Sequence, residues 1–290
     1  IIPLKGSVLQ FSFKLTKRRN IKGEFIMNRL QSKLTELKNT NKKGLFIYLT
    51  AGVNDFDMTL EAIKIAEKEG VDVIEIGIPF SDPIADGPII QQAAQIAIKN
   101  GASITNVLEF VKKVRTVTQI PLVCMGYINN VLTYGVEKFV LAAKSAGLDG
   151  AIIPDLPYEE ASNMLAICKK NDFSLINFVT PNTTAQRINE TCKNADGFIY
   201  CVSVNGVTGV REIDYTPINE VVKIVKQQTQ TPVAIGFGIG TPAAAKAASS
   251  VADNIIVGSA VMQKLMAEGL TAYGELIKTI RQALDEGSQV

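Results

Sequence analysis

Short apolar runs recur along the whole chain, and most are followed by a segment whose apolar residues return every three or four positions. Apolar or alternating runs of about seven residues predict β-strands, and the longer period predicts amphipathic helices. The predicted strands cover residues 44–50, 71–77, 121–127, 149–154, 173–179, 197–203, 232–238 and 254–259. The predicted helices cover residues 58–68, 136–145, 159–169, 185–192, 218–226 and 242–248, with one more at 29–37 ahead of the first strand.

The alternation of strand and helix, repeated eight times, is typical of two α/β folds. A closed (β/α)8 (TIM) barrel accounts for it best, and a doubly wound open sheet is the alternative. The 290 residues are enough for one large core, since domains of this size bury about 70–75% of the surface that the unfolded chain exposes. We predict that residues 27–290 form a single (β/α)8 barrel with an extra N-terminal helix.

The spacing of the predicted strands indicates where functional loops lie. Most strands start about 22–28 residues apart, but about 50 residues follow the start of the second strand and about 35 follow the start of the sixth. Loops after the C-terminal ends of barrel strands build the active site. The first long interval contains EIGIPFSDPIADGP (75–88), and the second contains VNGVTGV (204–210).

Glu75 and Asp86 are the candidate acid–base groups. Alternation along 71–77 places Glu75 on one face with Val71 and Val73, and places Ile74 on the other face. Burial disfavours a charged carboxylate and raises its pKa towards neutrality, where the group can both give and take a proton. The structural alternative is a buried glutamate paired with an arginine or lysine. Asp86 follows eleven residues later, in a loop rich in proline and glycine.

Glycine-rich turns after the last strands predict a phosphate site. The seventh strand runs into GFGIGTP (236–242), where Thr241 can cap a helix and Pro242 suits its first position. The eighth strand ends in VGSA (257–260). Barrels commonly bind phosphate at helix N-termini after strands seven and eight. Isolated glycines also serve turns that bind nothing, but the joint placement favours a phosphate ester as substrate. Neither string matches a nucleotide-binding fingerprint.

The residue types present restrict the chemistry. Histidine is absent, which excludes Ser-His-Asp and Cys-His triads and imidazole-bound zinc. No lysine ends a predicted strand, so a Schiff base is not indicated, and carboxylates alone leave only a loose hard-metal site as a metal option. Cofactor-free proton transfer remains. Tyr127, Tyr200 and Phe237 lie near the predicted rim, where they suit a planar apolar ligand or core packing equally.

The charge distribution and the cysteine content indicate which partners and which cellular compartment the chain has. Residues 1–26 hold six of the 30 basic residues and one acid, and the rest of the chain carries a net charge of −3. That distribution indicates no nucleic-acid partner, and no apolar run approaches the roughly 20 residues of a membrane span. Four cysteines without C-x-x-C spacing indicate core packing in a reducing, cytoplasmic compartment, namely Cys124, Cys168, Cys192 and Cys201.

The basic segment 1–26 lacks the order of a secretory signal, which places its charge before a longer apolar stretch. We predict that it is an extraneous or disordered extension and that the natural chain starts at Met27. A transit or anchoring role for this segment is the minor alternative.

The acidic string at 75–88 resembles the α subunit of tryptophan synthase. YCVSVNGVTG at 200–209, GFG at 236–238 and the pair Gly258 and Ser259 occur in the family's order and spacing, and the similarity extends from about Met27 to the C-terminus. The resemblance implies a lyase of L-tryptophan biosynthesis that cleaves indole-3-glycerol phosphate to indole and D-glyceraldehyde 3-phosphate without a cofactor or metal of its own. Indole would pass to a β chain that carries pyridoxal phosphate, in an α2β2 heterotetramer.

The resemblance also implies roles for individual residues. Glu75 corresponds to the carboxylate that protonates the indole ring carbon bearing the glycerol chain, and Asp86 to the one that faces the indole N–H. Tyr200 would lie near the glycerol chain, and Thr208 would bond Asp86 when a lid closes. The family's phosphate-binding positions correspond to Gly209, Gly238, Gly258 and Ser259. Its indole pocket corresponds to Tyr48, Tyr127 and Phe237. Its partner-facing surface corresponds to Pro79, Asp82, Asn129 and Pro157.

The chain departs from the family in two places. Residues 1–26 have no counterpart, and Val204 replaces an arginine that some members carry in the mobile loop; we expect neither change to alter the chemistry. Two other functions remain as alternatives. One is a binding subunit that activates and gates a β partner with little turnover of its own. The other is a different phosphate-handling barrel, either an isomerase or a stand-alone lyase that releases indole.

Overall fold

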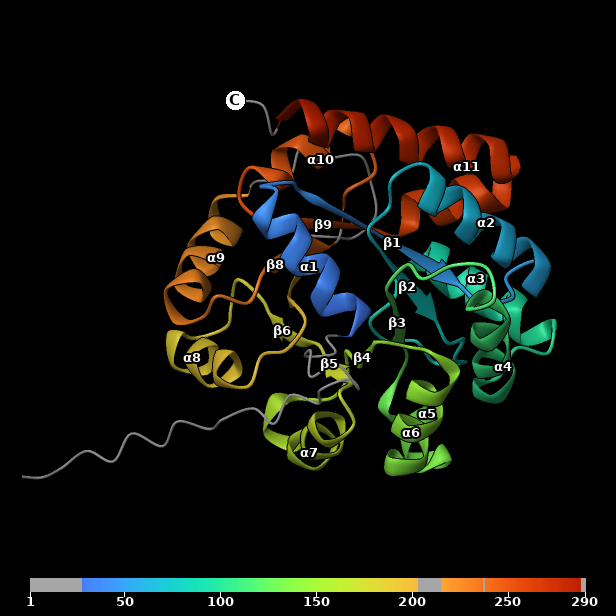
Figure 1. Cartoon of the computed structure of the whole chain (residues 1–290), viewed down its shortest axis with the longest axis horizontal. Coiled ribbons are helices and arrows are strands. Elements are labelled where there is room, and N and C mark those ends of the chain that lie inside the picture. The colour runs from blue at the N-terminus through green and yellow to red at the C-terminus, as the bar shows by residue number, and fades with distance from the viewer. Residues whose placement is uncertain (1–27, 203–214, 237, 288–290) are drawn as a thin grey trace, which may run out of the picture.

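The computed structural model describes residues 28–202, 215–236 and 238–287, so the extension predicted at 1–26 lies outside the described residues. The strands form one parallel sheet in the order β5-β4-β3-β2-β1-β9-β8-β7-β6 (Figure 1). Their bounds are β1 Gly44–Thr50, β2 Val73–Gly77, β3 Leu122–Met125, β4 Gly150–Ile152, β5 Ser174–Leu175, β6 Asn177–Val179, β7 Ile199–Val202, β8 Val233–Gly236 and β9 Asn254–Val257.

The two ends of this strand order are neighbours in the chain. Only Ile176 separates β5 from β6, and these two strands are the halves of the single strand predicted at 173–179. β5 pairs with β4 and β6 pairs with β7, so the sheet is a nearly closed barrel of eight strand positions. The predicted (β/α)8 fold is therefore confirmed.

Helices surround the barrel on its outer side (Figure 1). Their bounds are α2 Phe56–Lys68, α3 Pro88–Lys99, α4 Ile104–Val114, α5 Ile128–Tyr134, α6 Val136–Ala146, α7 Ser162–Lys170 after the short 3-10 turn η1 Tyr158–Glu160, α8 Ala185–Lys193, α9 Thr216–Gln228, α10 Pro242–Ser249 and α11 Ser259–Gly287. In the described residues, no helix has a stretch both long and apolar enough to cross a lipid bilayer.

The extra N-terminal helix, α1 Arg29–Asn39, covers one end of the barrel. Leu30, Leu34 and Leu37 are buried along one face of it and pack in the same cluster as the barrel-interior residues Phe46 and Phe198. Leucines at this spacing share one side of a helix. The helix thus closes the barrel at the N-terminal ends of the strands and leaves the other end to the loops.

The long interval after β2 is mostly helical, so the prediction of an extended functional loop is wrong for much of it. α3 and α4 occupy Pro88–Lys99 and Ile104–Val114, and the loop itself is limited to residues 78–87. α3 begins with Pro88 at its first position and buries Ala93, Ala94 and Ala97. A buried face built of alanine gives a weak hydrophobic period, which explains why the pattern did not predict this helix.

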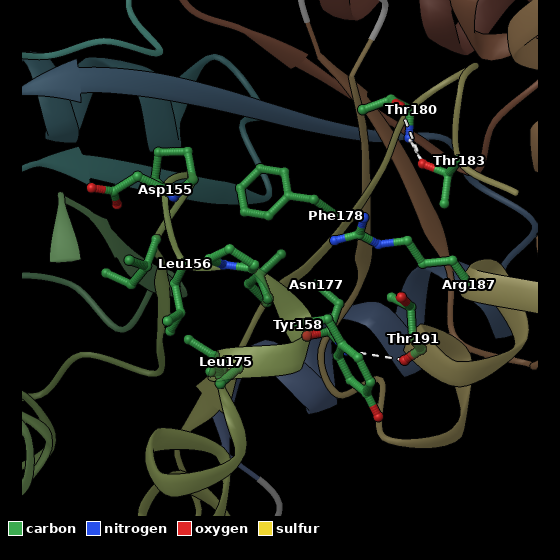
Figure 2. A pocket seen from close by; sticks show the side chains of 15 residues that line it. Asp155, Leu156, Tyr158, Leu175, Asn177, Phe178, Thr180, Thr183, Arg187 and Thr191 are labelled. Carbon is green, nitrogen blue, oxygen red and sulfur yellow. Dashed lines mark hydrogen bonds between the residues drawn. The ribbon is translucent and has the colours of Figure 1, made fainter.

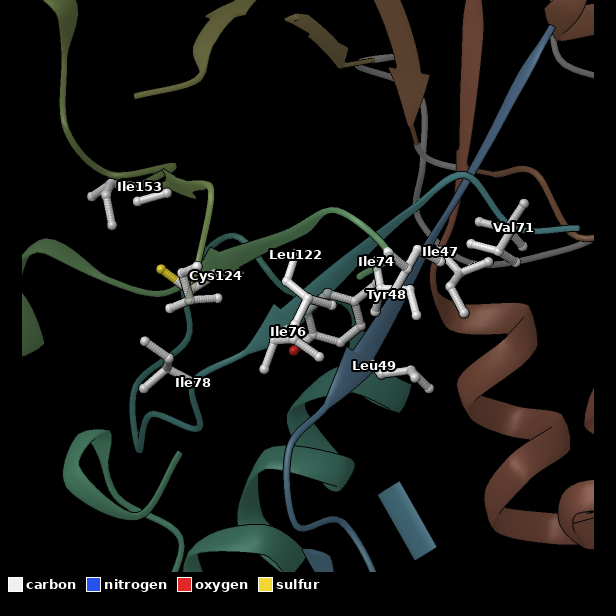
Figure 3. Close-up of a cluster of buried hydrophobic side chains, with 14 of the residues drawn as sticks. Ile47, Tyr48, Leu49, Val71, Ile74, Ile76, Ile78, Leu122, Cys124 and Ile153 are labelled. Carbon is white, nitrogen blue, oxygen red and sulfur yellow. The ribbon is translucent and has the colours of Figure 1, made fainter. Parts of the chain in front are cut away.

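Apolar side chains form two layers on either side of the strands. The outer layer lies between barrel and helices, and Figure 3 shows part of it, including Ile47, Leu49, Ile74, Ile76 and Leu122. The inner layer fills the barrel with Phe46, Val73, Val123, Ile152, Phe198 and Ile256. Because successive strand residues face opposite sides, Glu75 shares the interior face with Val73, as predicted. Val71 precedes β2 and packs in the outer layer, so its predicted face is wrong.

Aspartates tie the strands together at their N-terminal ends. Asp72 accepts a hydrogen bond from Leu45 N at 3.0 Å, Asp149 from Leu122 N at 2.9 Å, and Asp253 from Val233 N at 2.9 Å. Each aspartate immediately precedes a strand, and each accepts from an N–H near the start of the neighbouring strand. Buried backbone donors need such partners, so these carboxylates align adjacent strands at the end that α1 covers.

The four cysteines agree with the predicted core packing. Cys124, Cys168, Cys192 and Cys201 are all free and buried. Burial raises the pKa of Cys124, Cys168 and Cys201 to about 12, so these thiols stay protonated and pack as small apolar groups.

Candidate active site

Glu75 projects from β2 into the barrel. Its partners in the sheet register are Tyr48 on β1 and Val123 on β3. The residue is only 2% exposed, and within the described parts of the chain Oε1 has no hydrogen-bond partner. Burial raises the pKa of Glu75 to about 8, so the carboxyl group is protonated at neutral pH. In the described residues it forms no ion pair with arginine or lysine, so the structural alternative to an acid–base role is not observed there.

Asp86 lies in the loop that follows β2, near the start of α3. Its N–H donates to the Pro83 carbonyl at 3.1 Å, and its own carbonyl accepts from Gln91 Nε2 at 2.8 Å. The backbone around the carboxylate is therefore fixed on both sides. Burial raises the pKa of Asp86 to about 6, and a hydrogen bond from Tyr127 opposes that rise. Asp86 is mostly ionised at neutral pH, in contrast to Glu75.

Tyr127 connects the Asp86 loop to the end of β3. Its ring stacks on Phe80 with centroids 5.3 Å apart, and its hydroxyl accepts a hydrogen bond from Ala85 N at 3.1 Å. The side chain is 2% exposed. Burial is the largest cause of the raised pKa of Tyr127, with Asp86 as the next, so the hydroxyl remains a donor for the carboxylate. The structure thus places Tyr127 beside a catalytic candidate.

Tyr48 and Tyr200 cross the barrel interior over two glycines. A Cβ atom on Gly77 would overlap the Tyr48 hydroxyl, and one on Gly236 would overlap the Tyr200 hydroxyl. Both rings therefore occupy space that only glycine leaves free. Burial raises the pKa of both tyrosines, and the negative charges of Glu75 and Asp86 add to the effect. The two hydroxyls thus lie within electrostatic reach of both carboxyl groups.

Three residues of the site were not among the sequence candidates. Thr50 donates a hydrogen bond to the Tyr48 hydroxyl at 3.2 Å and is fully buried. Phe178 on β6 stacks on Tyr200 with centroids 5.2 Å apart, and Phe80 stacks on Tyr127. Thr50 and Phe178 fall at inward positions near the C-terminal ends of predicted strands, and Phe80 falls within the acidic string. Strand alternation, applied to these strand ends, is a signal that could have found the first two.

The N-termini of α10 and α11 meet next to the ends of β8 and β9. Thr241 caps α10 by accepting from Ala244 N at 3.2 Å, and α11 begins at Ser259, directly after Gly258. A Cβ atom on Gly240 would lie 3.1 Å from Ala260, so the two helix starts are in contact. Gly238 has a φ of 72°, which favours glycine. Because the first N–H groups of a helix have no partner inside the helix, two adjacent helix starts suit an anion. Thr208, Gly209 and Phe237 lie outside the described residues.

A separate pocket of about 320 Å³ lies between the ends of β4 and β6 (Figure 2). Neither Glu75 nor Asp86 lines it, whereas Phe178, which stacks on Tyr200, does. Its walls combine apolar and polar side chains, including Asp155, Leu156, Tyr158, Asn177, Thr180, Thr183 and Arg187. In the described parts of the chain, no three of the His, Cys, Asp or Glu side chains come together in a way that could hold a metal ion.

The fold and the site define a class of protein: a (β/α)8-barrel enzyme whose candidate acid–base groups lie towards the C-terminal ends of the strands. Comparison with known proteins specifies the class further. The sequence model of the family described as tryptophan synthase alpha chain matches residues 34–286. The chain belongs to the tryptophan synthase alpha chain family, as the sequence resemblance predicted.

Individual relatives agree with this assignment over nearly their full length. The tryptophan synthase alpha chains of Clostridium kluyveri and Caldanaerobacter subterraneus subsp. tengcongensis are 43% and 40% identical over 264 and 263 residues, which cover 89% of this chain and 100% of each relative. The crystal structure of tryptophan synthase subunit alpha from Legionella pneumophila matches with a TM-score of 0.84 at 35% identity, over 90% of this chain and 100% of that chain.

Proposed function

We propose that this chain cleaves indole-3-glycerol phosphate to indole and D-glyceraldehyde 3-phosphate, the alpha reaction of tryptophan biosynthesis. Membership of the family supports the reaction. The observation that carries the assignment of residues is the placement of the two carboxyl groups: Glu75 is buried inside the barrel with Oε1 unpartnered in the described residues, and Asp86 is held in the loop after β2. Burial raises the pKa of Glu75 to about 8 and that of Asp86 to about 6, so the two groups differ in protonation near neutral pH. Pairs of groups whose environments separate their pKa values are typical of acid–base catalysis.

In the proposed mechanism, protonated Glu75 donates its proton to the indole ring carbon that bears the glycerol chain. The positive charge that develops on the indole nitrogen is stabilised by ionised Asp86, which accepts a hydrogen bond from the N–H. The Glu75 carboxylate then takes the proton of the adjacent glycerol hydroxyl, and the carbon–carbon bond breaks to leave an aldehyde. The electron pair of the broken carbon–carbon bond restores the neutral indole ring. Glu75 ends protonated, so the cycle needs no cofactor.

The remaining residues bind the substrate in this proposal. Tyr48, Tyr127 and Phe237 surround the indole, and Tyr200 lies along the glycerol chain. The substrate phosphate binds where α10 and α11 start. Gly238, Gly258 and Ser259 contribute from the described residues, and Gly209 contributes from the segment beyond them. Thr208 bonds Asp86 in the closed state, which excludes water from the site.

We infer that the chain works in the cytoplasm with a β chain that carries pyridoxal phosphate, as an α2β2 heterotetramer. The surface expected to face that partner includes Pro79, Asp82, Asn129 and Pro157. Two large apolar side chains near these residues support a docking role: Ile84, in the loop after β2, is 81% exposed, and Leu132, on α5, is 57% exposed. Exposed apolar groups of this kind often mark an interface.

The experiment that tests the function measures indole release from indole-3-glycerol phosphate by the purified chain, with and without a tryptophan synthase β chain. Release that rises sharply with the β chain supports the proposal. Strong release that the β chain does not change points to a stand-alone lyase. If the chain binds glyceraldehyde 3-phosphate but releases no indole in either condition, a regulatory binding subunit accounts for it better.

A further inference from the structure

The carboxylate of Asp155, which follows β4, reaches across to the start of α5. Asp155 Oδ1 accepts a hydrogen bond from Ile128 N at 2.9 Å. Ile128 is the first residue of α5, and the residue before it, Tyr127, provides no side-chain cap. The first N–H groups of a helix have no partner inside the helix. The residue before α5 offers no side-chain acceptor for the first N–H of the helix. Asp155, which follows β4, supplies that acceptor.

Hydrogen bonds fix both the backbone and the side chain of Tyr127. Its carbonyl accepts from Asn130 N at 3.0 Å and from Val131 N at 3.3 Å, within the first turn of α5. At the other end its hydroxyl accepts from Ala85 N, next to Asp86. The peptide unit that joins Tyr127 to Ile128 is the one whose N–H binds Asp155. The orientation of the Tyr127 ring therefore depends on the same peptide that Asp155 holds.

We propose that Asp155 is a positioning residue for the cleavage reaction, which holds the start of α5 so that the Tyr127 hydroxyl keeps its hydrogen bond to the Asp86 carboxylate. This inference rests on the role proposed for Asp86. Asp155 does not touch the reacting atoms in this scheme and acts through Tyr127 alone.

The position of the Asp155 side chain supports this role over one in the neighbouring pocket. Figure 2 shows the Asp155 carboxylate pointing away from Phe178, Thr180 and Arg187. In the described residues Arg187 pairs instead with Glu159 at 2.8 Å, and Asp155 takes part in no ion pair. The carboxylate is thus directed at α5, where it accepts the hydrogen bond from Ile128 N.

The expected consequence concerns the protonation of Asp86. The hydrogen bond from Tyr127 lowers the Asp86 pKa against the effect of burial. Among the other titratable groups in the described residues, the charge of Asp86 reaches Tyr48 and Tyr200, on which Glu75 acts as well, and none of these groups carries a positive charge. Losing the Tyr127 contact therefore raises the Asp86 pKa further and leaves a smaller ionised fraction near neutral pH.

The test compares Asp155→Ala, Asp155→Asn, Tyr127→Phe and the double variant of Asp155→Ala with Tyr127→Phe in the full chain with its β partner. Asp155→Ala should lower kcat about fivefold to tenfold, leave KM within about twofold, and shift the acid limb of the kcat/KM profile to higher pH. Asp155→Asn keeps a side-chain oxygen acceptor and should restore both values. Tyr127→Phe should shift the limb in the same direction, and the double variant should add little to either single change.

Ser103→Ala is the matched control for the loss of a helix cap, because Ser103 caps α4 by accepting from Asn106 N at 3.3 Å. It should destabilise the chain without moving the acid limb. Asp86→Asn separates the inference from the proposed function. If Asp86→Asn abolishes turnover while Asp155→Ala or Tyr127→Phe keeps the parental kcat and acid limb, the positioning role is overturned and the function stands. If Asp86→Asn keeps turnover, the role of Asp86 itself is wrong.

Discussion

At the scale of single residues, Glu75 is held in a state that costs stability. Its folded pKa of about 8 lies above the ordinary value of 4.5, so the folded chain binds this proton more tightly than the unfolded chain. Stability from this group is therefore lost as pH rises from about 4.5 towards 8. Glu75→Gln should lower the rate of cleavage by about 100-fold or more. It should also raise the free energy of unfolding more at pH 8 than at pH 5. Indole release and urea unfolding at the two pH values measure these effects.

Glu109→Gln is the control for that substitution. Glu109 lies on α4, where its exposed side chain pairs with Lys112 at 2.6 Å. Exposed pairs of this kind contribute about 1 kcal/mol or less, so the variant should match the parent in turnover and in the pH dependence of unfolding. Substantial turnover in Glu75→Gln would remove Glu75 from the mechanism.

The two carboxyl groups together predict the pH profile of cleavage. In the proposed cycle Asp86 starts ionised and Glu75 starts protonated, so kcat/KM should be bell-shaped, with limbs near pH 6 and pH 8. Asp86→Asn should lower the maximum and remove the acid limb while it keeps the basic one. A profile that is flat from about pH 5 to 9 would contradict this assignment of roles.

At the scale of elements, the site depends on a contact between the ends of β1 and β2. Thr50 on β1 and Gly77 on β2 are register partners, and the Tyr48 ring lies over Gly77. Gly77→Ala should therefore displace the ring, destabilise the chain by about 1–3 kcal/mol, and slow cleavage. Adding Tyr48→Leu removes the outer ring atoms and should recover part of the lost stability but not the activity. Thermal or urea unfolding of the single and double variants measures the recovery.

Gly126→Ala is the matched control at the end of β3. A Cβ atom there meets nothing closer than Ile78 at 3.5 Å, an ordinary van der Waals contact, so the variant should keep its stability within about 0.5 kcal/mol. If Gly77→Ala is tolerated as well as Gly126→Ala, the glycine at position 77 is not required by the ring of Tyr48.

The elements differ in how far sequence alone predicts them. β1 has the predicted bounds, Gly44–Thr50, because a buried strand follows directly after polar residues. α11 was not predicted, since Gly269 with a φ of 80° interrupts it. Glu75 and Asp86 could be found because they share one specific string. The bond between Asp155 and Ile128 could not, because it forms only when β3 and β4 lie side by side.

At the scale of the whole molecule, the two ends of the barrel have different tasks. The N-terminal end, under α1, satisfies its buried charge: Asp149 is fully buried and pairs with Arg29 at 2.9 Å and with Arg115 at 3.0 Å. The C-terminal end instead holds Glu75 with an unpaired oxygen in the described residues. Buried charge is thus paired at one end, and the buried carboxyl group with the proposed catalytic role lies towards the other.

This division predicts that changes at the two ends have opposite effects on stability and activity. Asp149→Asn leaves two arginines without their carboxylate and should cost about 3–5 kcal/mol of unfolding free energy, yet keep kcat wherever the variant is folded. Most of the loss should come from Arg115, whose side chain is 10% exposed, rather than Arg29, which is 37% exposed. Arg29→Gln should therefore cost far less than Asp149→Asn. Urea unfolding and indole release measure both, and a folded Asp149→Asn chain with reduced kcat would show that the two ends are coupled.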